Sequence, residues 1–280
     1  LETDLDPGTG YKKLYVQAGN VRNRGLEMTL GFNKKFGGFE YNSSVTATAN
    51  RNKILKLASG VTNPITHEVF DLKDIVKGRF RLREGGELGD VYASERIKRD
   101  ANGYVDYTPG QSLVTEPTTP YKLGSVNAKW NLGWKHGFSY KGFDLNMLFT
   151  ARLGGIVISK TQAALDKFGV SQASADARDA GGINIGEGLT IAPQQFYDAV
   201  YNLDSYYVYS ATNVRLQELS LSYSLPKNFL GKTFKNVALS VYATNLWMIY
   251  NKAPYDPELT GSTGTFGQGY DYFMLPSQRT

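Results

Sequence analysis

Residues 26–33 read LEMTLGFN, a stretch in which apolar and polar side chains alternate strictly. Successive side chains of an extended chain point to opposite faces, so one face carries the apolar members Leu26, Met28, Leu30 and Phe32. The turn-like sequence KKFGG follows at residues 34–38, and residues 39–50 then alternate in the same way. The two segments together predict a hairpin of long amphipathic strands.

Two further strand pairs follow the same pattern. The predicted strands are residues 124–134 with 143–151, and residues 215–225 with 236–247. A turn around His136 and Gly137 is predicted to join the first pair. In the second pair, Pro226 ends the first strand, because proline has a fixed φ and no N–H to donate. The chain therefore contains three predicted hairpins.

Long, charged segments separate these hairpins, at residues 53–122, 154–212 and 251–275. Segments of this length are uncommon in compact soluble domains and usually carry function. Residues 68–76 and 161–168 are predicted to form short helices within them. Aromatic residues lie near the predicted strand ends: Phe36, Phe39, Tyr41, Trp134, Phe138, Tyr140, Trp247 and Tyr250.

The composition excludes several classes of protein. With 41% hydrophobic residues among 280, the chain is too apolar to be disordered. It has no cysteine, which excludes disulfides, a thiol nucleophile and cysteine-bound zinc. The chain has only two histidines, so a metal site or an acid–base site built from histidine is not expected. The net charge of +5 is spread without a basic run, so no nucleic-acid partner is predicted.

Two all-β architectures fit the alternation. In an up-and-down antiparallel barrel of the outer membrane, the apolar strand faces contact lipid, short turns lie on one side and long loops on the other. In a soluble β-sandwich that binds carbohydrate or mediates adhesion, the apolar faces of residues 124–134 and 143–151 are buried against a second sheet. The alternation of short turns with long loops, repeated along the chain, favours the barrel.

Several motifs carry a family resemblance. They are NRGLEMTL (23–30), NRNK (50–53), EGGELGDVY (84–92), RDANGY (99–104), LGS (123–125), RLGG (152–155), VRLQELSLSYSLP (214–226), NLW (245–247), YDPE (255–258) and PSQRT (276–280). In this order they resemble the C-terminal barrel half of the SusC/RagA-type family of TonB-linked outer-membrane transporters. The motifs cover nearly the whole chain, and the series is more specific than any single member.

The resemblance implies a non-enzymatic part of a transporter in the outer membrane of a Gram-negative bacterium. It implies a transmembrane barrel of about 22 strands with an N-terminal plug. Residues 1–280 are expected to be a C-terminal barrel fragment, with the plug and N-terminal strands absent and the final strand truncated. The implied partners are outer-membrane lipid, a SusD-like lipoprotein, the TonB complex, and an oligomeric nutrient that is a glycan or, less favoured, a peptide.

Four tyrosines form the substrate-binding prediction: Tyr201, Tyr206, Tyr207 and Tyr209. A tyrosine offers a flat apolar ring and a hydroxyl group, which suits stacking on a sugar or peptide at the extracellular mouth. The alternative is that the cluster packs the loop or lies at the membrane interface. No catalytic residue, cofactor or metal site is predicted.

Other polar groups receive less specific predictions. His67, Glu68, Asp71 and Asp74 are interpreted as a solvated loop in preference to a metal or acid–base site. The glycine-rich residues 181–188 (GGINIGEG) are predicted to be a flexible loop, and residues 255–258 a turn without calcium. Lumen-facing charges are expected to pair with one another or contact the plug, namely Glu27, Glu40, Lys129, Asp144, Arg152 and Glu218.

Overall fold

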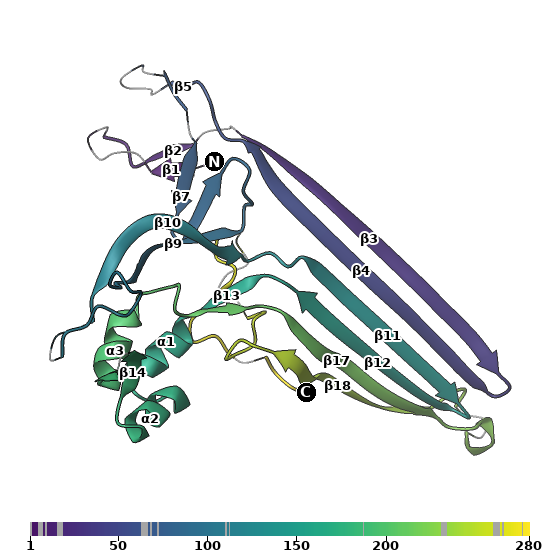
Figure 1. Ribbon diagram of the computed structural model, residues 1–280. Coiled ribbons are helices and arrows are strands. Elements are labelled where there is room, and N and C mark those ends of the chain that lie inside the picture. Colours follow the sequence, from purple (N-terminus) through teal and green to yellow (C-terminus); the bar gives the residue numbers. More distant parts are fainter. Residues whose placement is uncertain are drawn as a thin grey trace.

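Six long strands form one curved antiparallel sheet in the computed structural model of the chain (Figure 1). In sheet order they are β18 (Ala238–Asn251), β17 (Asn213–Ser224), β12 (Phe143–Leu153), β11 (Trp130–Tyr140), β4 (Phe39–Lys56) and β3 (Asn20–Phe36). The structure describes residues 2–4, 8, 10–15, 19–62, 67, 69–71, 73–109, 111, 113–186, 188–230, 234–259, 264, 266–275 and 277–280. Among these residues β3 and β18 each pair with one strand only, so the sheet is open.

The connections differ between the two ends of the sheet, as the sequence predicted. At one end, here called the turn end, residues 37–38 join β3 to β4, residues 141–142 join β11 to β12, and residues 225–237 join β17 to β18 (Figure 1). The last connection contains the 3-10 helix η2 (Lys227–Phe229). The long segments gather at the opposite end, here called the loop end (Figure 1).

The hairpin turn of β11 and β12 lies at Lys141 and Gly142, and the prediction of a turn at His136 and Gly137 is wrong. Lys141 and Gly142 have φ values of 45° and 86°, the positive values that a two-residue hairpin turn requires. His136 continues the strand on its apolar face, where its ring lies 4.2 Å from that of Trp134 and its Nδ1 is 2.9 Å from the Tyr41 hydroxyl.

Gly137 serves packing between strands. A Cβ atom at this position would lie 2.5 Å from Oδ1 of Asn42, the residue opposite it on β4. The glycine therefore makes room for the Asn42 side chain on the polar face of the sheet. Glycine is a turn signal in sequence, but here its small size is what the structure uses.

The predicted strand at residues 124–134 is in fact interrupted. β10 (Thr115–Ser125) ends before Val126, and β11 begins at Trp130. Val126 is buried with Phe80, Val91 and Ile158 in a small core at the loop end. The Arg152 guanidinium donates to the Val126 carbonyl over 2.6 Å, which holds the chain away from a continuous strand. As a result Trp134 lies in the middle of β11 and not near its end.

The apolar strand faces are exposed. Cross-strand partners share this face, for example Leu26 with Ala49 and Trp134 with Phe149. Trp134 is 50% exposed and Leu221 is 47% exposed, and no other sheet covers them among the described residues. A β-sandwich would bury these side chains, so the structure does not support the sandwich alternative.

A β-bulge keeps the apolar face continuous on β17. The register with β12 shifts between Leu148 and Phe149, so that Leu216 and Leu219 both face the same way although they are three residues apart. The Gln217 side chain at the bulge donates to Oδ1 of Asn245 over 2.9 Å. Asn245 has φ of +50°, a value that asparagine tolerates better than most residues.

The loop end contains short elements from three segments. The first segment holds β5 (Val61–Thr62), β6 (Val69–Phe70), β7 (Asp74–Lys77), β8 (Phe80–Arg83), β9 (Asp90–Ile97) and β10. The second holds β13 (Ile156–Ser159), α1 (Lys160–Lys167), α2 (Gln172–Asp179), β14 (Ile183–Gly186), β15 (Leu189–Ile191), α3 (Pro193–Val200) and β16 (Val208–Ser210). The third holds β19 (Tyr270–Asp271), and β1 (Glu2–Asp4) pairs with β2 (Lys13–Tyr15).

These elements confirm one local prediction and correct others. The helix predicted at residues 161–168 is α1. The helix predicted at residues 68–76 is wrong, because β6 pairs with β5 and β7 pairs with β8; Glu68 lies outside the described residues. The loop predicted at residues 181–188 contains β14, which pairs with β15. Three α-helices within the described part of the chain make the fold mostly β, not all-β.

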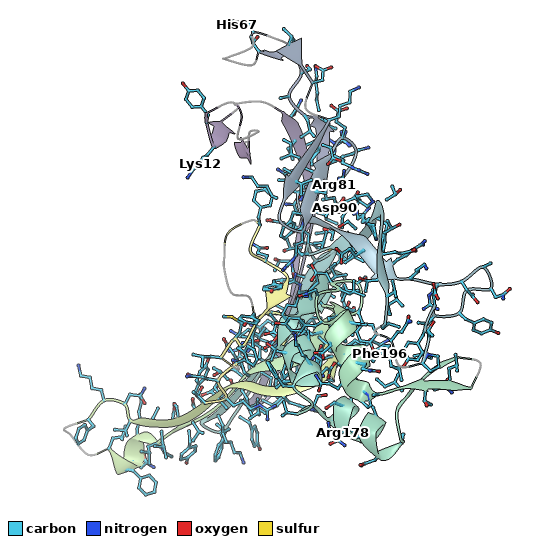
Figure 2. The ribbon with its side chains drawn as sticks, turned by 90° about the vertical axis from the view of Figure 1, so that its left-hand side faces the viewer. Lys12, His67, Arg81, Asp90, Arg178 and Phe196 are labelled. Atoms are coloured by element: carbon cyan, nitrogen blue, oxygen red, sulfur yellow. The ribbon has the colours of Figure 1, made fainter. Side chains whose placement is uncertain are left out.

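No helix of the described residues is long and apolar enough to cross a membrane. The cores of the chain lie at the loop end, as the dense side chains around Phe196 and Asp90 show (Figure 2). The largest surrounds α1 and α3 and consists of Leu113, Ala163, Ile191, Phe196, Tyr197, Val200, Leu203 and Tyr207. A second core joins Ile54 of β4 to Ile75 and Leu82 of the β7–β8 hairpin.

We predict that Gly137→Ala lowers the stability of the protein. The new methyl group would overlap the Asn42 amide, and overpacking of this kind costs about 1–3 kcal/mol. Thermal unfolding of the purified protein followed by circular dichroism measures the effect. The double variant Gly137→Ala/Asn42→Gly removes the overlap and should recover most of the loss. If the single variant melts like the wild type, the packing role of Gly137 is wrong.

Candidate functional site

The four predicted tyrosines lie together around the largest loop-end core. Tyr207 is fully buried within that core, and Tyr201 and Tyr209 pack against it. Tyr206 is 43% exposed, and its ring makes edge contacts with Phe196 at 5.5 Å and with Tyr207 at 5.0 Å. The cluster thus packs the loop, and of its four rings Tyr206 presents the most surface to a ligand. Substrate contact by these residues stays a prediction.

The hydroxyl groups of Tyr206, Tyr207 and Tyr209 stay protonated over the physiological pH range. Burial, followed by interaction with nearby tyrosine and aspartate groups such as Asp166, raises the pKa of Tyr206 to about 12 and that of Tyr209 to about 12. Burial also raises the pKa of Tyr207. Neutral hydroxyl groups of this kind can donate or accept hydrogen bonds, but they do not act as bases.

Two lysines of α1 face the ring of Tyr201. The ammonium groups of Lys160 and Lys167 lie 5.8 and 4.5 Å from its centroid. Lys160 also donates to the Tyr201 carbonyl over 3.0 Å and pairs with Asp204 at 3.0 Å. This ring is therefore already in contact with cations of the chain.

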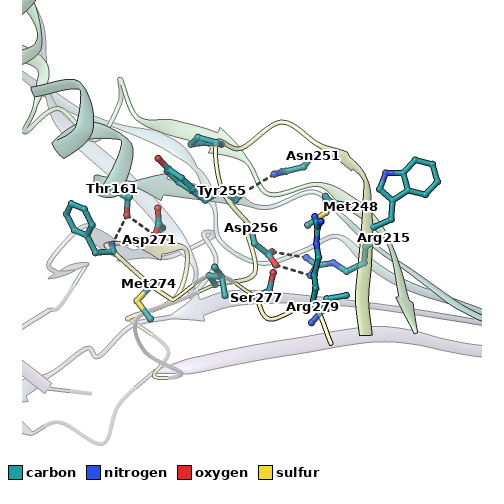
Figure 3. Close-up of a pocket in the computed structure, with 15 residues that line it drawn as sticks. Thr161, Arg215, Met248, Asn251, Tyr255, Asp256, Asp271, Met274, Ser277 and Arg279 are labelled. Atoms are coloured by element: carbon teal, nitrogen blue, oxygen red, sulfur yellow. Dashed lines mark hydrogen bonds and ion pairs between the residues drawn. The ribbon is translucent and has the colours of Figure 1, made fainter. Parts of the chain in front are cut away.

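A cavity of about 650 Å³ lies between the loop-end halves of β17 and β18 and the segment that follows β18 (Figure 3). Its size suits a small-molecule ligand or one unit of an oligomer. The lining is mixed, with apolar Met248, Pro254, Tyr255 and Met274 beside polar Asn245, Asn251, Ser277 and Arg279.

Arg215 holds the wall of this cavity together. Its guanidinium group, 6% exposed, donates two hydrogen bonds to the Asp256 carboxylate, at 3.0 and 2.8 Å (Figure 3). A second carboxylate, that of Glu258, lies 3.4 Å from it. Asn213, also buried, accepts from Arg215 and donates to Glu258. The YDPE turn is thereby fixed to β17, which confirms the turn predicted at residues 255–258.

The Asp256 carboxylate is ionised in this setting. Burial by itself raises its pKa, but hydrogen bonds from Arg215 and from the Glu258 backbone N–H outweigh burial and lower the pKa below its usual value. Asn251 completes the turn by donating to the carbonyl groups of Ala253 and Tyr255, both over 2.9 Å.

A second buried carboxylate closes the other side of the cavity. Asp271 of β19 accepts a hydrogen bond from Thr161 over 3.0 Å (Figure 3). It also accepts one from Ser159 over 2.7 Å. Thr161 in turn accepts from the Phe273 backbone N–H. These contacts attach the third long segment to the start of α1. Sequence reasoning missed Arg215 and Asp271, although the YDPE motif pointed to the region that binds Arg215.

The remaining predicted polar groups do not converge. Asp74 pairs with Arg81 and Arg83, and Asp71 accepts from the Gly60 backbone N–H, while Glu68 lies outside the described residues. In the described part of the chain, no three metal-ligating side chains come together.

The charges predicted to face the lumen do not pair with one another in the contacts of the described residues. Glu40 pairs with Lys35, Asp144 accepts from Ser139, and Arg152 donates to the Val126 carbonyl. The contacts of Glu40, Asp144 and Arg152 are thus local. Contact between these groups and a plug stays a prediction.

We predict that Arg215→Gln strongly destabilises the protein. Removing the cation leaves Asp256 buried without its counter-charge, which costs about 3–5 kcal/mol. Arg279→Gln is the matched control, because Arg279 lines the same cavity but is exposed. Thermal unfolding should show a large loss for the first variant and almost none for the second; equal losses would contradict the anchoring role.

The same pair makes stability depend on pH. Because the folded pKa of Asp256 is lowered, the ionised carboxylate adds stability above about pH 4 and loses it as the pH falls further. The difference in melting temperature between wild type and Arg215→Gln should therefore shrink below about pH 4. A difference that is constant from pH 7 to pH 3 would show that charge is not its cause.

Comparison with known proteins gives the chain its relatives. TonB-dependent receptor P3 of Formosa agariphila is 27% identical over 304 residues, covering 97% of this chain and 29% of the relative. TonB-dependent receptor P39 of the same organism is 22% identical, covering 96% of this chain and 30% of the relative. No family model matches the chain. The chain thus spans about 30% of the length of these relatives.

Solved structures share the fold. A structure described as the RagAB peptide transporter superposes with a TM-score of 0.68 at 19% identity, covering 99% of this chain and 30% of that chain. The RagAB peptide importer in its "open-open" state gives a TM-score of 0.66 at 18% identity. The fold of these structures agrees with the family resemblance read from the motifs. The chain is thus similar over nearly its whole length to a portion of the TonB-dependent receptors, which are outer-membrane proteins of Gram-negative bacteria.

Proposed function

We propose that residues 1–280 form a C-terminal part of the barrel wall and the extracellular loops of a TonB-dependent outer-membrane receptor. The observation that carries this proposal is the six-stranded sheet, with its exposed apolar face and its long segments gathered at one end. An open sheet of this length leaves backbone groups of β3 and β18 without strand partners among the described residues. Further strands that close a barrel of about 22 strands would satisfy them.

The receptor is proposed to import an oligomeric nutrient together with a SusD-like surface lipoprotein, using energy supplied through the TonB complex. The loop end would face the exterior, where the tyrosine cluster and the cavity beside Arg215 lie. Capture would occur at this mouth, and remodelling of a plug would release the nutrient inward. The present residues contribute wall and loops.

A glycan is the substrate class that the motifs suggest, and a peptide is the second candidate. The observation that favours a peptide is that the similar solved structures are described as a peptide transporter. The exposed ring of Tyr206 suits either ligand, because it could stack on a sugar ring or pack against a peptide side chain.

The membrane part of the proposal predicts opposite outcomes for neighbouring residues of β17. Leu221→Arg places a charge on the apolar face, and the cost of such a charge reaches about 2–4 kcal/mol at the bilayer midplane and falls toward the interface. Ser220→Arg is the control, because Ser220 lies on the polar face of the same strand. Recovery of folded receptor from the outer-membrane fraction measures both. Equal recovery of the two variants would count against lipid contact.

The transport part predicts that loss of the gene abolishes growth on one class of oligomer. Cells without the gene are grown on defined oligosaccharides or on defined peptides as the limiting nutrient. Loss of growth on oligosaccharides alone supports the glycan, and loss on peptides alone supports the second candidate. In the complemented strain, Tyr206→Ala should weaken uptake, while Phe168→Ala, another exposed aromatic of the loop end, should not. Unchanged growth on both classes would refute nutrient import.

A further inference from the structure

Four cations occupy the outer face of the β3–β4 hairpin at the loop end. Arg24 lies directly opposite Arg51, and Arg22 directly opposite Lys53. These pairs continue the ladder of Leu26 with Ala49, so they point to the apolar face of the sheet. All four side chains are exposed. We call Arg22, Arg24, Arg51 and Lys53 the β3–β4 basic cluster.

The cluster begins where the apolar ladder ends. The ladder runs from Phe36 and Phe39 at the turn end to Leu26 and Ala49, and it is apolar except for Lys34 and Ser43. Ten residues at about 3.3 Å each span roughly 33 Å along the strand, and a strand tilt of about 40° reduces this to roughly 25 Å of height. That height equals the usual apolar band of an outer-membrane barrel, about 25 Å. Arg24 and Arg51 therefore lie at the boundary of the band.

The described chain does not neutralise these charges. No carboxylate of the described residues forms an ion pair with any member of the cluster, whereas Lys35 at the turn end pairs with Glu40 at 2.9 Å. Glu27, the nearest acid along β3, alternates to the opposite face. Like charges placed directly opposite in a sheet repel each other. An anion from outside would remove that repulsion.

We propose that the β3–β4 basic cluster binds the phosphate groups of a phosphorylated lipid in the outer leaflet. This inference rests on the proposed function, which places the apolar face in lipid. Arginine donates two parallel hydrogen bonds to a phosphate, and the paired arrangement offers two such forks side by side. The lipid chains would lie on the ladder of Leu26 and Met28.

The test uses the full receptor, purified in dodecyl maltoside, with and without added lipid A. Three probes are compared in thermal unfolding and in lipid binding by native mass spectrometry: diphosphorylated lipid A, its dephosphorylated form and inorganic phosphate. The test variant is Arg24→Gln/Arg51→Gln. The control is Lys34→Gln, a cation on the same face of β3 at the turn end, where its ammonium group lies 5.5 Å from the Phe36 ring.

Diphosphorylated lipid A should bind and raise the melting temperature of the wild type and of Lys34→Gln. The double variant should bind it roughly 30-fold more weakly, as expected for two lost contacts of basic residues with a lipid surface. Equal binding by the double variant, or equal binding of the dephosphorylated lipid, would overturn the inference. Protection by inorganic phosphate alone would assign the site to a free anion. If the inference is overturned in this way but the wild-type receptor still imports the nutrient, the proposed function stands. If the wild-type receptor is not found in the outer membrane, both the inference and the proposed function are refuted.

Discussion

The arrangement of the chain depends on one constraint: every backbone group of the long strands must pair while one face stays apolar from strand to strand. The register shift at Gln217 shows how strictly this holds, because it keeps Leu216 and Leu219 on the same face despite their odd spacing. Gly137 has a related function on the other face, since it admits Asn42 without moving the strands apart. Burial against a second sheet does not stabilise this face, so its apolar character is explained by lipid.

The loop end is organised differently, by small cores and buried ion pairs. Arg79 connects all three long segments, because its guanidinium group pairs with Asp204 at 3.3 Å and lies 3.7 Å from the Tyr270 ring. Arg215 and Asp271 attach the segment after β18 in the same manner. Loops of this length would be costly to order without such contacts. A fixed mouth of defined shape is what capture of an oligomer requires.

The two ends of the sheet therefore have different roles in the proposed receptor. The turn-end two thirds carry an apolar outer face and few charges, which suits contact with lipid chains. The loop end carries the basic cluster proposed to contact lipid headgroups, and the cavity beside Arg215 where the proposed function places the ligand.

Much of the sheet could be predicted because period-two alternation is a local property. The β3–β4 and β12 strands follow directly from it. The prediction of a turn at His136 and Gly137 failed because glycine is a turn signal in sequence. In the structure both residues lie within β11, where packing against β4 decides their role. Prediction also failed at residues 68–76, where pairing between short strands overrides local helix propensity. For the tyrosine cluster, the sequence showed that the four residues are close together along the chain, but it did not show that Tyr207 is completely buried.

The sequence by itself determined that the strands are long and amphipathic, which connections are short and which long, and the family motifs. Each of these features depends on residues that are close together along the chain. Only the tertiary structure decided which side chains converge. Arg215 meets Asp256 across 41 residues, and Arg24 meets Arg51 across a hairpin. These contacts depend on register and on bulges, and a shift of one residue would send each side chain to the opposite face.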